Sequence, residues 1–386
     1  MKKNILVFTS KFAPVSETFI YNQTKALSTD NSIFLAATES LNDNIYPKDF
    51  IKALFTYNNI PVNLSDRIKS KLIRRGENHP YFLPYSSQKK LIDFIKENNI
   101  EYIYAHYGTN AVKLIEILKV LPYLKLYVAF HGYDASKQLA DKRYISRLSQ
   151  LINFNPTFIY CTNVLKENIA AVLPHNNIIE KVIPYGVDMS KIKQIKAHQY
   201  PSKKIKIIHA GRLTEKKGVL DLMKSYLDLS PDLKQKTELH IVGDGEEYQT
   251  IKEFAENNKD LSVFLHGAKP QQELMAFVKG ADIFVLNSRV STSGDSEGLP
   301  NAILEAMALK TAVISTNHAG IPEVVKNNET GLLIPEKDNQ ALKNAIEKLT
   351  KDEKLREQLS ANAYRLVSDS YSLENMHRQL NSLFND

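Results

Sequence analysis

Short apolar runs alternate with segments of helical period along the whole chain. Runs such as Ile5–Phe8 are continuous and are not interrupted by polar residues at every second position. Strands of this kind are buried on both faces, which is typical of parallel sheets covered by helices. The pattern predicts strands near Asn4–Ser10, Ser32–Thr38, Tyr102–Gly108, Leu126–Gly132, Phe158–Thr162, Lys181–Gly186, Ile205–Gly211, Glu238–Gly243, Val263–Gly267, Asp282–Asn287, Ala312–Thr316 and Gly331–Ile334. It predicts helices between them, for example at Gln88–Asn99, Asn110–Leu121, Val219–Leu229, Glu246–Asn257 and Asn339–Leu349.

So many strands in one sheet would be unusual, which favours two α/β domains. The break is best placed at residues 188–204, which are polar and basic and contain Pro201. We therefore expect doubly wound, Rossmann-like domains at residues 1–190 and 191–370, facing a cleft. Residues 371–386 have the apolar spacing of a terminal helix. In such sheets ligands bind at the carboxyl ends of the strands, so candidate chemistry is sought there.

The net charge of +7 adds an asymmetry to this picture. Residues 1–190 carry 23 Lys and Arg against 16 Asp and Glu, whereas residues 191–386 carry 27 of each. One segment, "SDRIKSKLIRRGENHP", holds five of the basic residues: Arg67, Lys69, Lys71, Arg74 and Arg75. Such a patch suits lipid headgroups or lipid-linked phosphates, and a solvated helix face explains it equally well. Aromatic residues are not interleaved with the basic ones, so nucleic acid is not expected.

The first strand of the second half ends in "HAGRLTEKKG". Gly211 lets the backbone approach a ligand, Arg212 and Lys217 place two cations near one turn, and Gly218 opens a helix. Fixed positive charge beside helix amides suits a phosphate. A basic but merely solvated loop is the alternative.

The next two strands end in glycine turns. In "IVGDGEE", Gly243 and Gly245 make a tight turn into a helix, but the full dinucleotide fingerprint is absent, so NAD is not supported. In "LHGAKP", the backbone around Ala268 is positioned to border a base, and an ordinary turn is the other interpretation.

The segment "SEGLPNAILEAMA" follows the strand near Asp282–Asn287. Pro300 suits the first turn of a helix, which leaves Glu297 in the preceding loop and puts Glu305 on the second turn. The free amides of Gly298, Leu299 and Asn301 would favour an anion at the helix start. A carboxylate such as Glu305 can accept two hydrogen bonds from a sugar diol. The alternative is that both acids only complement the charge of the helix start.

The segments "GRLTEKKG", "VGDGEE", "SEGLPNAILEAMA" and "GIPEVVKNNETGLLIP" together resemble the retaining GT-B glycosyltransferases of family GT4, in the family's order. "FAPVSETFIYNQ", "YAHYGTN" and "HGYDAS" extend the resemblance into the first half, and "SETFI" with "SGDSEGLPN" is similar to bacterial transferases of capsule, exopolysaccharide or O-antigen synthesis. The resemblance also implies that the terminal helix crosses back to the first domain.

What the resemblance implies for each residue can be stated in the numbering of this chain. The diphosphate of a nucleotide-sugar donor would be held by Gly211, Arg212, Lys217, Gly243 and Leu299. Glu305 would bind the ribose hydroxyls, the backbone at Ala268 would meet the base, and Glu297, Gly298 and Leu299 would contact the donor sugar. His131 would face the donor across the cleft and, with Glu297, act in catalysis. His106 and Asp134 would lie on the acceptor side.

One departure from the family concerns the loop after the first strand. Many relatives have a glycine-rich loop there, where this chain has "KFAPVSETF". In those relatives the loop backs the donor diphosphate; here the hydroxyls of Ser16 and Thr18 would take its place, or a helix would begin at Ser16. We place Ser16 on the acceptor side.

The expected activity is metal-independent transfer of a sugar from a nucleotide diphosphate sugar, with retention, to a glycan or polyprenyl-diphosphate-linked acceptor. The resemblance implies that no metal or cofactor is needed, and the chain agrees with this, since it has no Asp-x-Asp and no His/Cys cluster with ligand spacing. The lone Cys161 fits a reducing cytoplasm, with peripheral contact to an anionic inner membrane as a further hypothesis. Two alternatives remain: a GT-B-type sugar-nucleotide epimerase, and a non-catalytic sugar-nucleotide-binding subunit.

Overall fold

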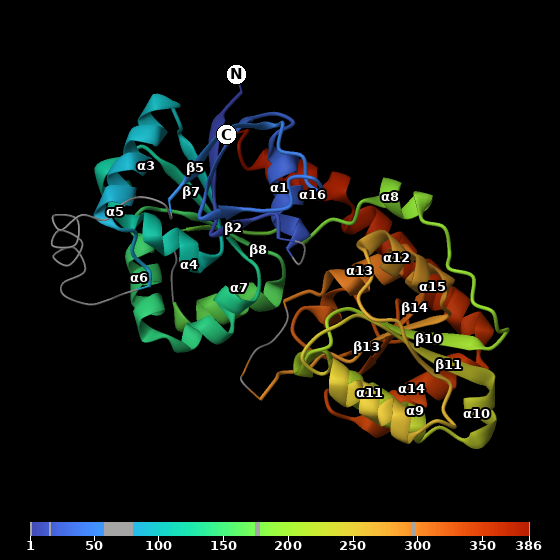
Figure 1. Cartoon of the computed structure of the whole chain (residues 1–386). Helices are drawn as coiled ribbons and strands as arrows, with labels where there is room; N and C mark the ends of the chain where they lie inside the picture. Colours follow the sequence, from blue (N-terminus) through green and yellow to red (C-terminus); the bar gives the residue numbers. More distant parts are fainter. Residues whose placement is uncertain are drawn as a thin grey trace. The chain divides into compact units, whose positions relative to one another are not determined.

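The computed structural model describes residues 2–14, 17–57, 80–173, 178–292, 294 and 298–385. The chain forms two compact units (Figure 1). Unit 1 comprises Met1–Pro184 together with Met376–Asp386, and unit 2 comprises Tyr185–Asn375. Each unit is an α/β domain with a parallel sheet, which confirms the predicted fold class. The division falls at Tyr185, a few residues before the position expected from the sequence.

The sheet of unit 1 has the strand order β5-β3-β1-β6-β7-β8-β9, and every pairing is parallel. Its strands are β1 (Asn4–Phe8), β3 (Ser32–Ala37), β5 (Ile51–Thr56), β6 (Tyr102–His106), β7 (Lys125–Phe130), β8 (Thr157–Tyr160) and β9 (Ile179–Val182). The central strands are apolar on both faces because helices cover both. The strand order reverses between β1 and β6, which is where doubly wound sheets bind ligands.

The helices of unit 1 connect these strands, and a small sheet pairs β2 with β4. The elements are β2 (Lys11–Phe12), α1 (Thr18–Leu27), β4 (Glu39–Ser40), α3 (Tyr85–Glu97), α4 (Gly108–Ala111), α5 (Ile115–Val120), α6 (Lys142–Ile152) and α7 (Asn163–Val172), with 3₁₀ turns η1 (Val112–Leu114), η2 (Tyr133–Ala135) and η3 (Lys137–Ala140). Helix α1 begins two residues after Ser16, which itself lies outside the described residues.

The segment that follows unit 2 along the chain packs on unit 1. Helix α16 (Leu373–Ser382) leads to Phe384, whose buried ring contacts the rings of Tyr102 and Tyr127. The Tyr127 hydroxyl donates to the Leu383 carbonyl at 2.9 Å, and the Lys3 ammonium donates to the Phe384 carbonyl. The core of unit 1 is therefore completed by residues far away in the sequence.

The sheet of unit 2 has the order β12-β11-β10-β13-β14-β15, again all parallel. Its strands are β10 (Ile205–Ala210), β11 (Thr237–Val242), β12 (Val263–Leu265), β13 (Ile283–Leu286), β14 (Ala312–Thr316) and β15 (Leu332–Ile334). The helices and turns are α8 (Met189–Gln194), η4 (Glu215–Lys217), α9 (Val219–Leu227), α10 (Pro231–Lys236), α11 (Tyr248–Asn257), α12 (Gln271–Gly280), α13 (Asn301–Ala308), η5 (Ile321–Glu323), α14 (Asn339–Lys351) and α15 (Glu353–Ser370). Here the order reverses between β10 and β13.

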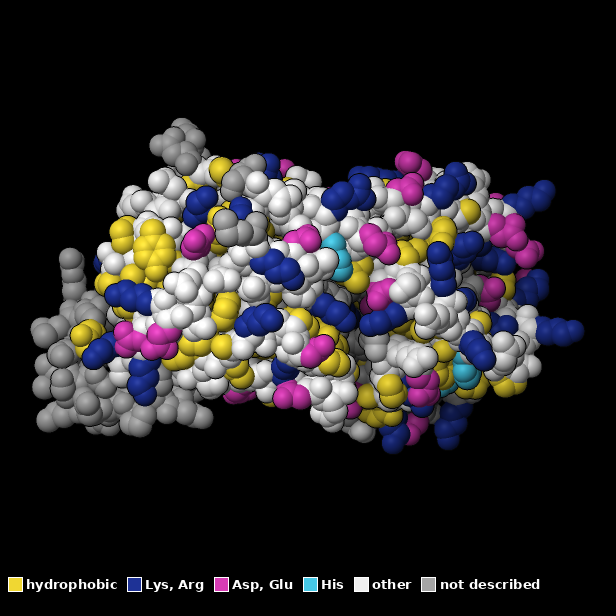
Figure 2. Space-filling view, turned by 90° about the horizontal axis from the view of Figure 1, so that it is seen from above, with side chains coloured by type: hydrophobic (Ala, Val, Ile, Leu, Met, Phe, Trp, Pro, Cys, Tyr) yellow, Lys and Arg dark blue, Asp and Glu magenta, His cyan; other side chains and the backbone are white. Residues whose placement is uncertain are grey.

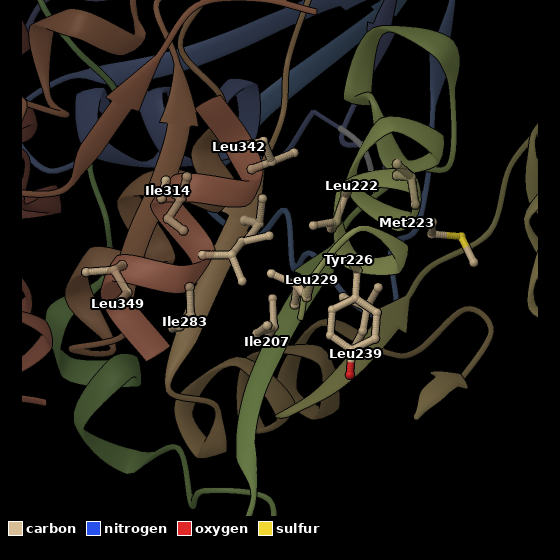
Figure 3. Close-up of a cluster of buried hydrophobic side chains, with 14 of the residues drawn as sticks. Ile207, Leu222, Met223, Tyr226, Leu229, Leu239, Ile283, Ile314, Leu342 and Leu349 are labelled. Carbon is tan, nitrogen blue, oxygen red and sulfur yellow. The ribbon is translucent and has the colours of Figure 1, made fainter. Parts of the chain in front are cut away.

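Figure 3 shows the core beneath one face of this sheet. Strand residues Ile207 and Ile283 pack against Tyr226 of α9 and Leu342 of α14, and all four are fully buried. Burying an aliphatic or aromatic side chain contributes about 1.5–3 kcal/mol each. This packing fixes α9 against the sheet and so positions the loop that leads into it.

One predicted helix and one predicted strand of unit 1 run differently in the structure. The predicted helix Asn110–Leu121 is interrupted by η1, where Arg147 donates from Nη2 to the Val112 carbonyl at 2.9 Å and occupies an acceptor of the helical ladder. The last strand, β9, spans Ile179–Val182 and not Lys181–Gly186. Its pairing with β8 stops after the Ile183 amide donates to the Tyr160 carbonyl at 2.8 Å, because β8 itself ends at Tyr160.

The edge strand β5 was not predicted. Its residues alternate between half-buried and exposed, so Ile51–Thr56 lacks the fully buried run that marked the other strands.

The surface and the secondary structure bear on the membrane hypothesis. Within the described residues no helix is both long and apolar enough to cross a membrane. On the face seen in Figure 2, basic side chains are interspersed with acidic ones. The basic residues Arg67 to Arg75 lie outside the described residues, so that hypothesis stays a prediction.

Candidate functional site

Three loops at the carboxyl ends of β10, β11 and β12 are joined by backbone hydrogen bonds. Gly211 donates to the Val242 carbonyl at 3.0 Å, and Gly243 donates to the Gly267 carbonyl at 2.9 Å. Gly243 has φ +150°, and a Cβ there would lie 1.8 Å from the Gly211 carbonyl oxygen. Glycine at this position therefore allows the first two loops to touch. Ala268 follows directly and is exposed.

The loop after β10 is also tied to the loop after β13, across the point where the strand order reverses. Gly218 has φ +62°, and a Cβ there would lie 2.2 Å from the Asn287 carbonyl oxygen. Arg289 donates from Nε to the Glu215 carbonyl at 3.0 Å and forms an ion pair with Asp221. The Glu215 carboxylate in turn accepts hydrogen bonds from Thr292. Sequence reasoning missed Arg289, although a cation directly after a buried strand was a usable signal.

The two cations predicted to bind phosphate lie on this loop. Arg212 is exposed, and its guanidinium makes no hydrogen bond or ion pair within the described part of the chain. Lys217 is half-buried, and its charge adds to the effect of burial in lowering the pKa of His209 to about 4. His209 Nδ1 donates to the Val285 carbonyl at 3.2 Å, which assigns the proton to Nδ1 and leaves Nε2 as an acceptor.

Helix α13 begins beside the same loops. Pro300 precedes its first turn, and the carbonyl of Gly298 accepts a hydrogen bond from Gly320 at 2.9 Å, which anchors the loop. The amides of Gly298 and Leu299 donate to no acceptor within the described residues, so their N–H groups are available at the positive end of the helix. Glu297 lies outside the described residues.

Glu305 projects from the second turn of α13 and is half-buried. Gln271 of α12 donates from Nε2 to its carboxylate at 2.9 Å. Burial raises the pKa of Glu305 to about 7, and the hydrogen bond from Gln271 opposes part of that rise. The second carboxylate oxygen remains available for a ligand hydroxyl.

In unit 1, His106 and His131 lie side by side at the ends of β6 and β7. His106 Nδ1 and His131 Nε2 are 3.0 Å apart, so one ring donates a hydrogen bond to the other. Burial lowers the pKa of His106 to about 3, and burial together with the neighbouring ring holds that of His131 well below its ordinary value. His131 also packs against the rings of Phe19 and Tyr107. Both histidines are therefore neutral at pH 7.

Asp134 is fully buried and accepts backbone hydrogen bonds. The amides of Gly108, His131 and Gly132 donate to its carboxylate at 2.7, 3.0 and 3.2 Å. Burial raises its pKa to about 6 against the opposing effect of these bonds. Asp134 thus holds the loops after β6 and β7 together, and its carboxylate faces backbone amides.

The structure brings the predicted site residues into separate groups. Gly211, Gly243 and Lys217 share the joined loops of unit 2, and Gly298, Leu299 and Glu305 belong to the start of α13. His131, His106 and Asp134 form a buried group in unit 1. Within the described residues, no three His, Cys, Asp or Glu side chains are arranged to hold a metal ion.

Solved structures with the same architecture identify the fold. HepE of Anabaena, solved in complex with UDP, matches with a TM-score of 0.77 at 18% identity, and the match covers 99% of both chains. A sucrose-phosphate synthase of Thermosynechococcus elongatus matches with a TM-score of 0.75 at 17% identity, covering 99% of this chain and 98% of that one. The fold is that of the GT-B glycosyltransferases.

The sequence comparisons give the family. Residues 190–366 match the family described as "Glycosyl transferases group 1". The putative colanic acid biosynthesis glycosyltransferase WcaL of Salmonella typhimurium is 30% identical over 286 residues, which are 72% of this chain and 69% of that one. The amylovoran biosynthesis glycosyltransferase AmsK of Erwinia amylovora is 32% identical over 65% of this chain and 60% of its own. The chain belongs to the group 1 glycosyl transferases and is a glycosyltransferase.

Proposed function

We propose that the protein transfers a sugar from a nucleotide diphosphate sugar to a glycan or lipid-linked acceptor during synthesis of a bacterial surface polysaccharide, without a metal and with retention at the anomeric carbon. The observation that carries this proposal is the convergence in unit 2 of Lys217, the unpaired Arg212 and the free amides of Gly298 and Leu299 around one sheet switch point. The names of WcaL and AmsK, which refer to colanic acid and amylovoran, support the polysaccharide, and the complex of HepE with UDP supports the donor class.

The residues take roles that follow from their chemistry. Arg212 and Lys217 bind the diphosphate, and the start of α13 adds the amides of Gly298 and Leu299. Glu305 accepts the two ribose hydroxyls, with Gln271 fixing the orientation of its carboxylate. The exposed backbone at Ala268 borders the base.

The hardest step is the departure of the diphosphate, which gains negative charge as the glycosidic bond breaks. Cations and amides that already point at the leaving oxygen stabilise this charge without reorganising. In a front-face transfer, the leaving phosphate takes the proton of the acceptor hydroxyl. Glu297 orients the hydroxyls of the donor sugar, and neutral His131 donates or accepts a hydrogen bond there as an uncharged group.

A thermal-shift screen of nucleoside diphosphates tests the donor site, and product analysis tests the reaction. We expect one base to give the largest shift, and free nucleoside diphosphate to form when the cognate sugar donor and an acceptor are both supplied. An isomerised donor formed without acceptor would indicate an epimerase. Tight binding with no turnover over a broad acceptor panel would indicate a binding subunit.

Glu297→Gln and His131→Ala are expected to lower kcat about tenfold each, because each removes one polar contact to the donor sugar. The affinity for the nucleoside diphosphate should stay unchanged, since neither side chain touches the nucleotide in the proposal. Steady-state kinetics and calorimetry measure both quantities. Glu256→Gln, at an exposed position of α11, is the matched control for the loss of a carboxylate. Turnover near the wild-type value in both test variants would contradict these assignments.

Glu305 gives the donor site a pH dependence. Its pKa of about 7 means that the carboxylate is ionised at pH 8 and mostly protonated at pH 6. The ionised form accepts both ribose hydroxyls, so affinity for the nucleoside diphosphate should fall up to about tenfold from pH 8 to pH 6. Calorimetry should show this added fall in the wild type and not in Glu305→Gln. Titration of the ligand's own phosphate is common to both, so identical profiles would rule out this role.

A further inference from the structure

Unit 1 contains a pocket of about 390 Å³ that none of the roles above uses. It lies at the carboxyl ends of β1 and β6, where the strand order of the sheet reverses. Its walls include Ser10, Lys11, Glu17, Thr109, Asn110 and Lys113. Such a position is the expected binding edge of a doubly wound sheet.

Lys113 is the unusual group in this wall. Its side chain is half-buried, and burial lowers its pKa. The ammonium donates to Asn110 Oδ1 at 3.0 Å and forms no ion pair with a carboxylate in the described residues. An ammonium has three N–H donors and is costly to desolvate without an opposite charge. By contrast, Lys119 of the neighbouring α5 is exposed and paired with Glu116 at 3.0 Å.

The neighbours of Lys113 hold its ammonium in place. Asn110 donates from Nδ2 to the His106 carbonyl at 2.9 Å, and its Oδ1 accepts a second hydrogen bond from Ser10 Oγ at 2.6 Å. The amide is therefore fixed in one orientation, and it fixes the direction of the Lys113 ammonium. A lysine held in one direction in this way is typical of a preorganised ligand site, whereas a solvated lysine is free to move.

The wall carries a net charge of +1, from Lys113 and Lys11 against Glu17. Lys11 contributes a second cation, which lies 3.7 Å from Glu39 at an exposed position. Glu17 is the acidic residue of the wall, and it accepts a hydrogen bond from the phenol of Tyr107. The hydroxyls of Ser10 and Thr109 add polar groups beside the cations.

We propose that this pocket binds a negatively charged group, a phosphate or a carboxylate, on the acceptor substrate, with Lys113 as its direct ligand and Lys11 as a second cation. The inference rests on the proposed function, because it assumes an acceptor. The donor diphosphate has its own cations and amides on unit 2, whereas the acceptor has no other assigned charge partner in the described residues.

The first test observes Lys113 directly. The full chain is labelled with ¹³Cε-lysine, and the Lys113 resonance is assigned by its loss in Lys113→Arg. Sodium pyrophosphate and sodium glucuronate are titrated separately, with sodium chloride at matched ionic strength as the control. Either anion is expected to raise the pKa of Lys113 by about one unit, a tenfold preference for the charged form. A response to pyrophosphate assigns a phosphate-bearing acceptor, and a response to glucuronate assigns an acidic sugar.

Failure of both anions to move the Lys113 resonance would overturn the proposal. So would a response to the nucleoside diphosphate equal to that for pyrophosphate, because the pocket would then serve the donor. If no nucleoside diphosphate binds the wild-type chain at all, the proposed function fails instead, and the two failures are distinguishable.

The second test compares two charge deletions in the same unit. In Lys113→Met, the anion affinity reported by the amide resonances of Ser10 and Thr109 should fall about 10- to 100-fold, while Lys113→Arg retains it. Lys119→Met removes the same charge outside the pocket and should change nothing. Nucleoside diphosphate affinity should be unchanged in all three variants, and the amide resonances of unit 1 outside the pocket, unchanged from the wild type, show that each is folded. Equal losses of anion affinity in Lys113→Met and Lys119→Met would show that only the net charge of unit 1 matters. That result would contradict a specific anion site at Lys113.

Discussion

Arg212→Met is expected to lower kcat about 100- to 1,000-fold, the usual loss when one preorganised donor to a developing oxyanion is removed. Arg212 is exposed, and its guanidinium has no hydrogen bond or ion pair in the described residues, so the substitution breaks no internal contact. The whole loss of kcat therefore measures a lost contact between Arg212 and the ligand. Because charge develops on the diphosphate during bond breaking, kcat should fall further than the affinity for the nucleoside diphosphate.

Stopped assays for released nucleoside diphosphate give kcat, and calorimetry gives the affinity. Lys224→Met is the matched control, since Lys224 is exposed on α9 of the same unit and lies outside the loops of the site. An equal decline in Arg212→Met and Lys224→Met would mean that removing a positive charge anywhere on unit 2, and not removing a contact to the diphosphate, lowers turnover. A kcat for Arg212→Met within threefold of wild type would remove Arg212 from the mechanism, a discrimination of about 0.6 kcal/mol.

Gly243→Ala is expected to destabilise unit 2 by about 4 kcal/mol, because a Cβ at this position collides with backbone that cannot rotate away. The added atom would lie 1.8 Å from the Gly211 carbonyl oxygen and 3.0 Å from the Gly211 carbonyl carbon, on a backbone with φ +150°. Relief requires the loop after β10 to move, and with it Arg212. The variant should therefore lose nucleoside diphosphate affinity together with stability, as measured by urea unfolding and calorimetry.

Gly267→Ala measures the cost of the backbone conformation in the absence of a steric collision. Gly267 has φ +66°, but a Cβ there meets no atom within 4 Å, so only the left-handed conformation costs free energy, about 1–2 kcal/mol. Comparable destabilisation by the two substitutions would show that the contact between Gly211 and Gly243 is not what joins the loops.

Much of the fold was predictable because most strands are buried on both faces and appear as continuous apolar runs. The edge strand β5 was missed because Ile51 and Phe55 alternate with exposed residues, which is the weaker pattern of a half-covered edge. The interruption of the helix after Gly108 was also unpredictable, since its cause is Arg147, a side chain 35 residues away that binds the Val112 carbonyl.

The candidate site, like the fold, could be predicted from the sequence only in part. Residues next to strand ends, such as Arg212 and Lys217, could be nominated from the sequence because parallel topology gathers strand ends at one edge. Asp134 could be nominated but not interpreted, because its partners are backbone amides, including that of Gly108 on another strand end. Lys113 lay inside a helical pattern, and nothing in the sequence showed that no carboxylate would lie beside it.

The packing of Phe384 on Tyr102 and Tyr127 has a consequence for biosynthesis. The ribosome makes residues 1–184 first, then the whole of unit 2, and only afterwards the stretch from Met376 that fills the hydrophobic interior of unit 1. Domains generally fold as they emerge, so the second-made unit can mature co-translationally while the first-made one waits, partly open, for its final piece. In nascent chains stalled before Met376, unit 2 should therefore be more resistant to protease than unit 1.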